Sequence, residues 1–493
     1  MRTKNLNLRP RHFQRLELIG PIIVFTLGLI YAGILASNMV RRSNYFQAST
    51  FDMGLFVQMF HNMARGQGPI CTLERDQLLS HLQVHMSPIF YLMLPGFCLS
   101  RTGANLQIQQ ILVFVSGIIP IILIARKLEI SLHLQLCFSA LYLLNPAIFM
   151  SSFYDLHENV FLAPLLLWLL YAIFSERLWM ILVTSVLCLL VKEDAGLYVI
   201  CIGLYALCRP SHRSIRYKWV LAGIDILLPM LYFITVILYL QNFGDGAMLN
   251  RFNNLLLPGE SGITAMMKNL LLNPTYALAG CFRPAEFFFL LVSLLSLAFF
   301  PLLQRYWYNF LLFLPFVVIN LLSDYPYQHM LGFQYNYGSQ TLLIVMVLLS
   351  FAEAFPKRPR YHFIRHTALV FGLVFSLFFT GYTLNDASTA TMRQAESRRP
   401  MRSELNRLVG TWDSSLSTLT SAFLTSDLAH FPHLYELGKH QNIESSPAIE
   451  QIIVWEDLCD DLERLHLESL LQSGDFILEP TQSGEFFKVY RHK

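Results

Sequence analysis

The chain alternates between long apolar runs and short polar stretches up to about residue 385. A helix needs roughly 20 apolar residues to cross a hydrocarbon core, and runs near this length recur. A further apolar run, 86–100, is too short to be counted as a membrane span. The pattern predicts an α-helical polytopic membrane protein with about eleven spans. The expected spans are 18–37, 106–125, 134–152, 160–174, 178–191, 195–208, 219–240, 286–304, 307–322, 338–355 and 367–384.

After residue 385 the apolar runs become short, and polar residues and helix formers take over. This change predicts a small C-terminal α/β domain. A turn signal at 482–484 predicts a hairpin that pairs 476–479 with 486–490. The other expected elements are strands at 419–424 and 452–455 and an amphipathic helix at 458–471.

Basic residues indicate which face of the membrane each loop occupies. If the N-terminus is cytoplasmic and 86–100 is a juxtamembrane or re-entrant helix, nearly all basic clusters lie inside. Only Arg41 and Arg42 then fall outside. The clusters on the inner side are Arg126 and Lys127, Arg177, Arg209 to Lys218, Arg305, and Lys357 to Arg365.

This orientation divides the chain into three parts in a plasma (inner) membrane. The N-terminal segment 1–17 is basic and cytoplasmic, and 18–385 is the multi-span domain with a first outer loop at 38–105. The α/β domain, 386–493, is expected to be extracytoplasmic.

Composition agrees with a membrane protein, since 54% of the residues are hydrophobic and 14% are charged. Soluble domains usually carry about 25% charged residues. The net charge of +3 gives no indication of a nucleic-acid partner, and the eight cysteines show no CxxC spacing. We therefore expect the lipid bilayer as a partner and no disulfide framework.

Four polar motifs fall at the outer boundary of the predicted spans. Ionisable groups near the hydrocarbon cost about 2.5–3.5 kcal/mol on insertion scales, so such clusters usually have a function. Their convergence on one face predicts an active site or a transport path. The motifs lie at 51–54, 154–158, 192–194 and 323–329.

The first two motifs contain the candidate catalytic residues. Asp52 could be a general base that takes a proton from an acceptor, or a helix N-cap. Asp155, His157 and Glu158 could hold a divalent ion, bind sugar hydroxyls or position Asp52. A solvated loop is the alternative for this second group.

The other two motifs contain candidate substrate-binding residues. Lys192 could contact a phosphate, while Glu193 and Asp194 limit the cost of burying it. A tight turn with its charges in water is the alternative. His329 is the candidate of the fourth motif, whose tyrosines we interpret mainly as an interfacial aromatic belt.

Two histidines in the first outer loop raise the question of a metal. His81 and His85 are four residues apart and share a face if the segment is helical. Asp155 could complete a divalent metal site with them, and His85 is also a candidate substrate contact. Interfacial histidines bonded to backbone or headgroups are the alternative.

Together the motifs resemble a family of bacterial predicted membrane proteins related to the GT-C glycosyltransferases. The resemblance covers most of the membrane region and extends more loosely to the C-terminal domain. It is carried by Phe51-Asp52-Met53-Gly54-Leu55-Phe56, His85-Met86-Ser87-Pro88, Tyr154-Asp155-Leu156-His157-Glu158 and Lys192-Glu193-Asp194-Ala195.

The resemblance implies a GT-C architecture and a polyprenyl phosphate-linked sugar donor. It implies that Asp52 acts at the catalytic centre, that Asp155 assists, and that Lys192 contacts the donor phosphate. The family's usual Asp-aromatic-His-Pro-Glu motif is altered here. Leu156 replaces the aromatic residue and Glu158 stands at the proline position, which puts the role of Glu158 in doubt.

The leading hypothesis is a membrane glycosyltransferase that moves a sugar to an unknown acceptor at the outer face. A transporter or channel is the alternative, although transporters place ionisable groups near the midplane and show repeated halves. A non-catalytic membrane scaffold is the third possibility. A polar outer cavity with a lipid-sized side opening would favour the enzyme.

Overall fold

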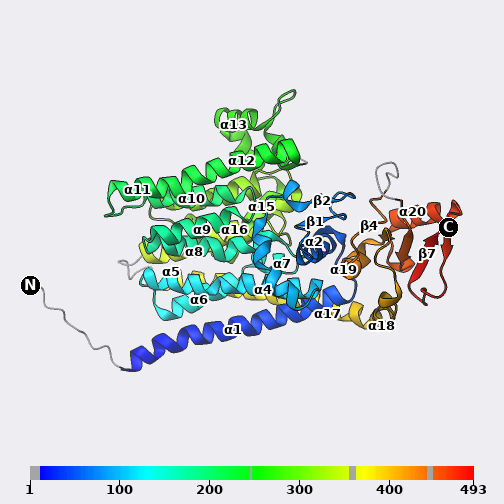
Figure 1. The fold of residues 1–493 in the computed structure, drawn as a ribbon. Helices are drawn as coiled ribbons and strands as arrows, with labels where there is room; N and C mark the ends of the chain where they lie inside the picture. The colour runs from blue at the N-terminus through cyan, green and yellow to red at the C-terminus, as the bar shows by residue number, and fades with distance from the viewer. Residues whose placement is uncertain (1–10, 245–246, 355–361, 441–447) are drawn as a thin grey trace, which may run out of the picture.

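The computed structural model describes residues 11–244, 247–354, 362–440 and 448–493. Most of the chain forms a bundle of helices, and a C-terminal sheet lies beyond one end of it (Figure 1). Helices α1 to α10 are Arg11–Asn44, Leu55–Ala64, Leu94–Leu99, Gly103–Ser116, Ile118–Lys127, Leu132–Leu143, Pro146–Ser151, Leu162–Phe174, Leu178–Leu189 and Ala195–Cys208. Helices α11 to α20 are Ile215–Ala222, Leu228–Phe243, Ile263–Leu272, Pro274–Gly280, Pro284–Ser296, Asn336–Leu349, His362–Ser397, Arg399–Leu408, Thr425–Leu428 and Asp461–Gln472.

The number of membrane spans is lower by a strict criterion than the sequence pattern predicts. Among the described residues, four helical stretches are long and apolar enough to cross a membrane, and the α14–α15 pair, bent by 75°, would add a fifth. The expected eleven spans are therefore not confirmed. The four stretches are Ile22–Asn44, Gly103–Lys127, Ile215–Phe243 and His362–Ser397.

Other apolar runs fold into shorter or broken helices. Four of them form apolar helices of 10–17 residues. The run at 307–322 instead forms a 3₁₀ turn, Trp307–Leu312, and a π turn, Phe316–Leu321, separated near Pro315. Proline removes a backbone donor and interrupts helical hydrogen bonding, which explains why hydrophobicity alone overestimates long helices here.

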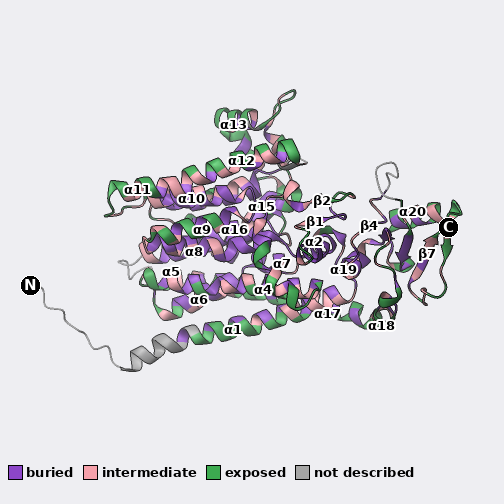
Figure 2. Ribbon diagram, in the orientation of Figure 1, coloured by how far each residue is buried: buried purple, intermediate pink, exposed green. Residues whose placement is uncertain are grey.

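Helix α16 lies at the centre of the bundle, and all fourteen of its residues are buried. It packs against α8, which in turn packs against α5 and α9. Helices α1, α12 and α17 lie further out and expose apolar side chains (Figure 2). Apolar side chains on the outside are what lipid contact favours. Examples are Ile22, Phe25, Leu27, Leu231, Ile234, Phe371 and Phe378.

The C-terminal residues beyond α17 form a five-stranded mixed sheet in the order β4-β3-β5-β7-β6. Strand β3 pairs in parallel with β4 and β5, while β7 is antiparallel to β5 and β6. The β6–β7 pair is the hairpin that the turn signal predicts. The strands are Thr418–Thr420, Leu434–Glu436, Gln451–Val454, Phe476–Leu478 and Lys488–His492.

The sheet differs from the expected elements in two places. Strand β4 has no counterpart among them. The predicted strand at 419–424 ends at Thr420, and a 3₁₀ turn, Ala422–Leu424, leads directly into α19. Helix α17 also continues past residue 385 to Ser397, so no break at residue 385 separates the helical bundle from the C-terminal part.

The C-terminal part docks onto the first loop, which contains α2 and the small ribbon of β1, Ile70–Cys71, and β2, Leu79–Ser80 (Figure 1). Gln58 donates to the carbonyl of Phe431 at 3.3 Å, and Thr72 donates to that of Leu434. Phe46 packs edge-on against Trp455 with ring centroids 5.6 Å apart. The first loop and the last quarter of the chain therefore form one continuous contact.

Candidate functional site

A cavity of about 660 Å³ lies between the helical bundle and the first loop. Its wall combines charged groups with aromatic rings, and it takes residues from four distant parts of the chain. The lining residues are Phe51, Asp52, Leu55, Phe56, Glu74, Arg75, His81, Val84, His85, Tyr154, His157, Arg251, Asp324, Tyr325, Tyr327, Phe333, Gln334 and Tyr335.

Asp52 sits in this wall on a strained turn. Its φ of 64° and ψ of −53° break the π turn Thr50–Gly54 that leads into α2. A positive φ is uncommon for a residue with a side chain and costs of order 1–3 kcal/mol, so the surroundings must hold it. Strain of this kind clusters at functional sites. Tyr154 lines the same cavity as Asp52.

The C-terminal part supplies the contacts that hold this turn. The Thr50 hydroxyl lies 3.1 Å from the Thr425 hydroxyl and donates to the carbonyl of Ala422 at 3.3 Å. Gly54 packs directly against the Thr425 side chain, and a Cβ added there would collide with it. Gly54 has an ordinary helical φ of −59°, so its small size rather than its flexibility is what the site uses.

Asp155 lies behind the lining and is only 4% exposed. Arg42 donates to Asp155 Oδ1 at 2.6 Å and to the carbonyl of Phe153 at 3.0 Å. Burial raises the pKa of Asp155 to about 6, against the opposing effect of Arg42. Arg42, which violates the pattern of basic residues on the inner side, is thus explained as the partner of a buried carboxylate.

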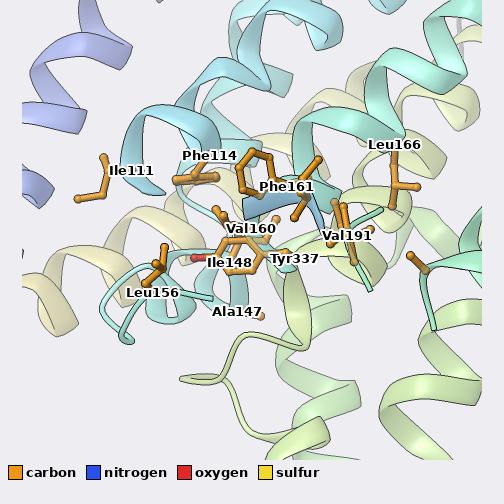
Figure 3. Close-up of a cluster of buried hydrophobic side chains, with 14 of the residues drawn as sticks. Ile111, Phe114, Ala147, Ile148, Leu156, Val160, Phe161, Leu166, Val191 and Tyr337 are labelled. Carbon is orange, nitrogen blue, oxygen red and sulfur yellow. The ribbon is translucent and has the colours of Figure 1, made fainter. Parts of the chain in front are cut away.

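The loop that carries Asp155 and His157 is anchored on both sides. Gln110 of α4 accepts from the His157 backbone N–H at 2.9 Å and donates to the carbonyl of Tyr154 at 3.2 Å. Leu156 belongs to a buried apolar cluster with Ile148 and Tyr337 (Figure 3). The alternation of polar, apolar and polar residues therefore directs neighbouring side chains to opposite sides of the loop.

Glu158 and Lys192 form a buried ion pair that joins the second and third motifs. Lys192 Nζ lies 2.8 Å from Glu158 Oε1, and both side chains are fully buried. His157 Nδ1 lies 3.0 Å from the other Glu158 oxygen. Lys192 also lies 5.8 Å from the ring centroid of Tyr335, a residue of the cavity wall. Glu158, whose role the altered motif puts in doubt, is therefore the counterion of Lys192.

Two histidines of the first loop each form a hydrogen bond between a ring nitrogen and a glutamate carboxylate. His85 Nδ1 lies 2.9 Å from Glu193, which also accepts from the Met86 backbone N–H at 3.0 Å. His81 Nδ1 lies 3.0 Å from both oxygens of Glu74. The third motif and the first loop are thereby joined through Glu193.

Glu74 and His81 lie within ion-pair distance, and each shifts the pKa of the other. Burial acts to raise the pKa of Glu74, but His81 holds it below its usual value. Burial likewise acts to lower the pKa of His81, but Glu74 raises it above its usual value. Each partner therefore favours the charged form of the other.

Arg251 dominates the electrostatics of the opposite wall. Its guanidinium lies 4.9 Å from the ring centroid of Tyr325 and 5.2 Å from that of Tyr335, and its Nη1 has no hydrogen-bond partner among the described residues. The carbonyl of Arg251 accepts from the backbone N–H of Asp324 at 2.9 Å. The tyrosines that we interpret as a membrane belt line this cavity instead.

A second, apolar hollow of about 370 Å³ adjoins the first and also contains Arg251. It lies between α10, α12, α13 and the Phe316–Leu321 turn, and Asp194 is at its polar end. Several of its apolar residues are about half exposed, so it opens at the outside of the bundle. These include Met230, Ile234 and Met267.

Of the predicted site residues, the lining thus contains four: Asp52, His81, His85 and His157. Asp155, Glu158, Lys192 and Glu193 form a charged layer directly behind them, and Asp194 lies in the apolar hollow. His329 lies elsewhere, with Nε2 3.7 Å from Glu286.

The proposed metal ligands do not come together. Asp155 is bound to Arg42, whereas His81 and His85 each use Nδ1 on a glutamate. Within the described part of the chain, no group of three or more His, Cys, Asp or Glu residues could hold a metal ion. These residues do not fit a divalent metal site, and we assign no step to one.

The comparisons with known proteins identify the family. A family model described as predicted membrane protein (DUF2079) matches residues 42–457. The chain belongs to this family. The match includes all four motifs, and it confirms the family expected from them. No curated protein matches the chain by sequence.

The fold of this DUF2079 protein is also found among solved structures. ArnT from Cupriavidus metallidurans bound to undecaprenyl phosphate matches with a TM-score of 0.53 at 10% identity, over 95% of this chain and 97% of that chain. Arabinofuranosyltransferase AftD from Mycobacteria matches at 0.48 and 13% identity, over 95% of this chain and 40% of that chain. We base no argument on that second, weaker similarity.

Sequence reasoning misses Arg251, Glu74 and two of the three α4 glutamines. Arg251 is a single basic residue in a segment without a motif, so nothing local distinguishes it. Gln107 and Gln110 do carry a signal, because amides inside an apolar helix need partners. In the structure both glutamines form hydrogen bonds with the 154–158 loop, and Gln107 donates to Asp155 at 3.5 Å.

The buried pair generates a prediction about stability. Lys192→Met leaves Glu158 without its lysine counterion and should lower the free energy of unfolding by about 3–5 kcal/mol. The double variant Lys192→Met/Glu158→Gln should recover most of this loss, because neither charge is then buried. Thermal unfolding of the purified protein measures both. The exposed Lys268→Met serves as the control, and an equally unstable double variant would contradict the ion-pair account.

The Glu74–His81 pair generates a pH prediction. The contribution of His81, whose pKa is raised, is present below pH 6.5 and is lost as pH rises through its folded pKa. The contribution of Glu74, whose pKa is lowered, is present above pH 4.5 and is lost on acidification. The stability advantage of wild type over Glu74→Gln should therefore peak between about pH 4.5 and 6.5. A difference that is flat across thermal scans from pH 4 to 9 would refute the pair.

Proposed function

We propose that this protein is a membrane glycosyltransferase with a polyprenyl phosphate-linked sugar donor and an acceptor bound at the outer face of the plasma membrane. The observation that carries the proposal is the position of Arg251. It lines both the polar cavity that contains Asp52 and the apolar hollow between α10, α12 and α13.

The two adjoining spaces match the two halves of such a donor. A polyprenyl chain is apolar and gains about 0.8 kcal/mol for each buried CH₂ group. The apolar hollow would take the part of the chain nearest the phosphate, and the sugar would lie in the polar cavity. A polar cavity with an opening to the lipid is the arrangement that favours a transferase over transport.

The phosphate would lie at the junction and contact Arg251. Guanidinium groups bind phosphate through two parallel N–H donors, and Nη1 of Arg251 is buried without a hydrogen-bond partner among the described residues. The family resemblance implies that Lys192 makes this contact, but Lys192 is fully buried against Glu158. In our proposal Lys192 supports Tyr335 from behind the cavity wall, and Arg251 contacts the phosphate.

Asp52 would act as the general base. It would take the proton from an acceptor hydroxyl or amine as the acceptor oxygen or nitrogen forms its bond to the anomeric carbon. The bond from that carbon to the phosphate oxygen would break, and polyprenyl phosphate would leave with its negative charge stabilised by Arg251. Tyr154 lines the same cavity as this carboxylate, and Asp155 would position the loop rather than touch substrate.

The remaining wall suits a sugar. Tyr325, Tyr327 and Phe333 form one aromatic group, with ring centroids 5.0 Å and 4.4 Å apart in successive pairs. Aromatic faces pack against the C–H faces of sugar rings, while His85, His157 and Asp324 offer hydrogen bonds to hydroxyls. The similarity to ArnT, which was solved with undecaprenyl phosphate, supports the lipid phosphate but leaves the sugar and the acceptor open.

The catalytic role of Asp52 predicts a large loss of product. Asp52→Asn should reduce transfer by about 10²–10⁴-fold, the range for removal of a general base. The measurement is a mass-spectrometric profile of envelope glycans and glycolipids in a deletion strain rescued with each variant at equal membrane abundance. Asp386→Asn, on the exposed side of α17, is the matched control. Full product with Asp52→Asn would exclude it as the base.

The role of Arg251 predicts a defect in binding the lipid phosphate. Hydrogen bonds to a charged group contribute about 1.5–3 kcal/mol, so Arg251→Gln should weaken binding of undecaprenyl phosphate by about 10–100-fold. The readout is the thermal shift of purified protein as the lipid is titrated. Lys268→Gln is the control, because it removes a positive charge from α13 and Lys268 lines neither the polar cavity nor the apolar hollow. Equal binding of the lipid by Arg251→Gln and wild type would contradict the proposed contact between Arg251 and the phosphate.

A further inference from the structure

A third cavity, of about 440 Å³, lies at the opposite ends of the helices that carry the site. Helix α8 starts beside Glu158 and ends at Phe174, and α10 starts after Asp194 and ends at Cys208. The cavity is formed by these far ends together with the start of α11. It is therefore separated from the Asp52 cavity by the length of α8 and α10.

The charges around this cavity are unbalanced. Arg209, Arg213 and Lys218 line it, whereas Glu176 is the one carboxylate among its described lining residues. Arg213 Nε lies 2.5 Å from Glu176, and the Ser211 hydroxyl also donates to this carboxylate at 3.2 Å. Among the described residues, no ion pair within 4.0 Å involves Arg209 or Lys218. In that part of the chain, two cations thus face the cavity without a close ion-pair partner.

Arg209 is held in place by an aromatic ring. Its guanidinium lies 4.7 Å from the ring centroid of Phe174, which also lines the cavity. The nearby Glu353 attracts Arg209 through space, but its carboxylate accepts from Asn309 at 2.8 Å. This ring contact holds the guanidinium at the cavity, where its N–H groups can donate to a ligand.

The surroundings place this cavity at the level of lipid headgroups. Trp219, the residue after Lys218, is 72% exposed, and Ile215 is 69% exposed. Tryptophan and apolar residues beside basic ones are typical of the membrane–water interface. Basic pockets between helices at this level bind anionic headgroups.

From these observations we propose that this cavity is a binding site for a phosphate group. The ligand is a phosphate diester of an anionic lipid headgroup or a soluble phosphate monoester, held by Arg209 and Lys218. Basic residues that only orient the protein in the membrane would need neither a cavity nor a stacked guanidinium. The site lies away from the Asp52 cavity, so it stands independently of the proposed transferase activity.

The experiment counts ligands on the purified full-length protein by native mass spectrometry. One arm titrates phosphatidylglycerol against phosphatidylcholine, and a second arm titrates glycerol 3-phosphate. The variants are Arg209→Gln and Lys218→Gln, and the matched control is Arg216→Gln, an exposed residue of the same segment outside the lining. Thermal unfolding of each variant separates a binding defect from a loss of the fold.

We expect a preference for phosphatidylglycerol that falls at least tenfold in Arg209→Gln and in Lys218→Gln and stays unchanged in Arg216→Gln. Saturable binding of glycerol 3-phosphate with the same variant pattern supports the site and identifies a soluble ligand as its source. Equal losses in all three variants would show general charge attraction and overturn the proposal. Absence of binding in both arms, with all variants folded, would also overturn it.

Discussion

A lysine ammonium enclosed within a helical bundle is costly, because removing it from water costs several kcal/mol. Lys192 is fully buried, and the site depends on how its charge is balanced. Glu158 balances it from the 3₁₀ turn that precedes α8, and the adjacent Glu193 binds His85 of the first loop at 2.9 Å. These pairs have specific partners and short range, so they fix the relative positions of three motifs in a way that apolar packing alone would not.

The same arrangement separates the groups that face the cavity from the groups that support them. Asp52 and His157 line the cavity. The pairs Asp155–Arg42 and Glu158–Lys192 lie behind them. Buried pairs are rigid, since moving either partner exposes an uncompensated charge. This rigid layer supports the strained Asp52 turn on the side that faces the helical bundle.

The sequence predicts best what depends on neighbouring residues alone. The apolar runs at 178–191 and 195–208 contain α9 and α10 almost to the residue, because hydrophobicity and length decide such helices locally. Motifs also locate Asp52 and His157. They do not locate Arg251 or the Arg42–Asp155 pair, because a single arginine has no local signature and that pair joins positions 113 residues apart. Strand β4 is also missed, since its partners include β3 and Thr72 of the distant first loop.

The Thr50–Thr425 contact joins positions 375 residues apart and has a consequence for biosynthesis. Helix α1 and the first loop emerge from the ribosome early and enter the membrane long before Ala422 and Thr425 are translated. During that time the turn at Asp52 lacks the partners that hold its unfavourable backbone angle. The cavity is therefore completed last, after every apolar segment is in place, and a nascent or truncated chain could be fully inserted without having a formed site.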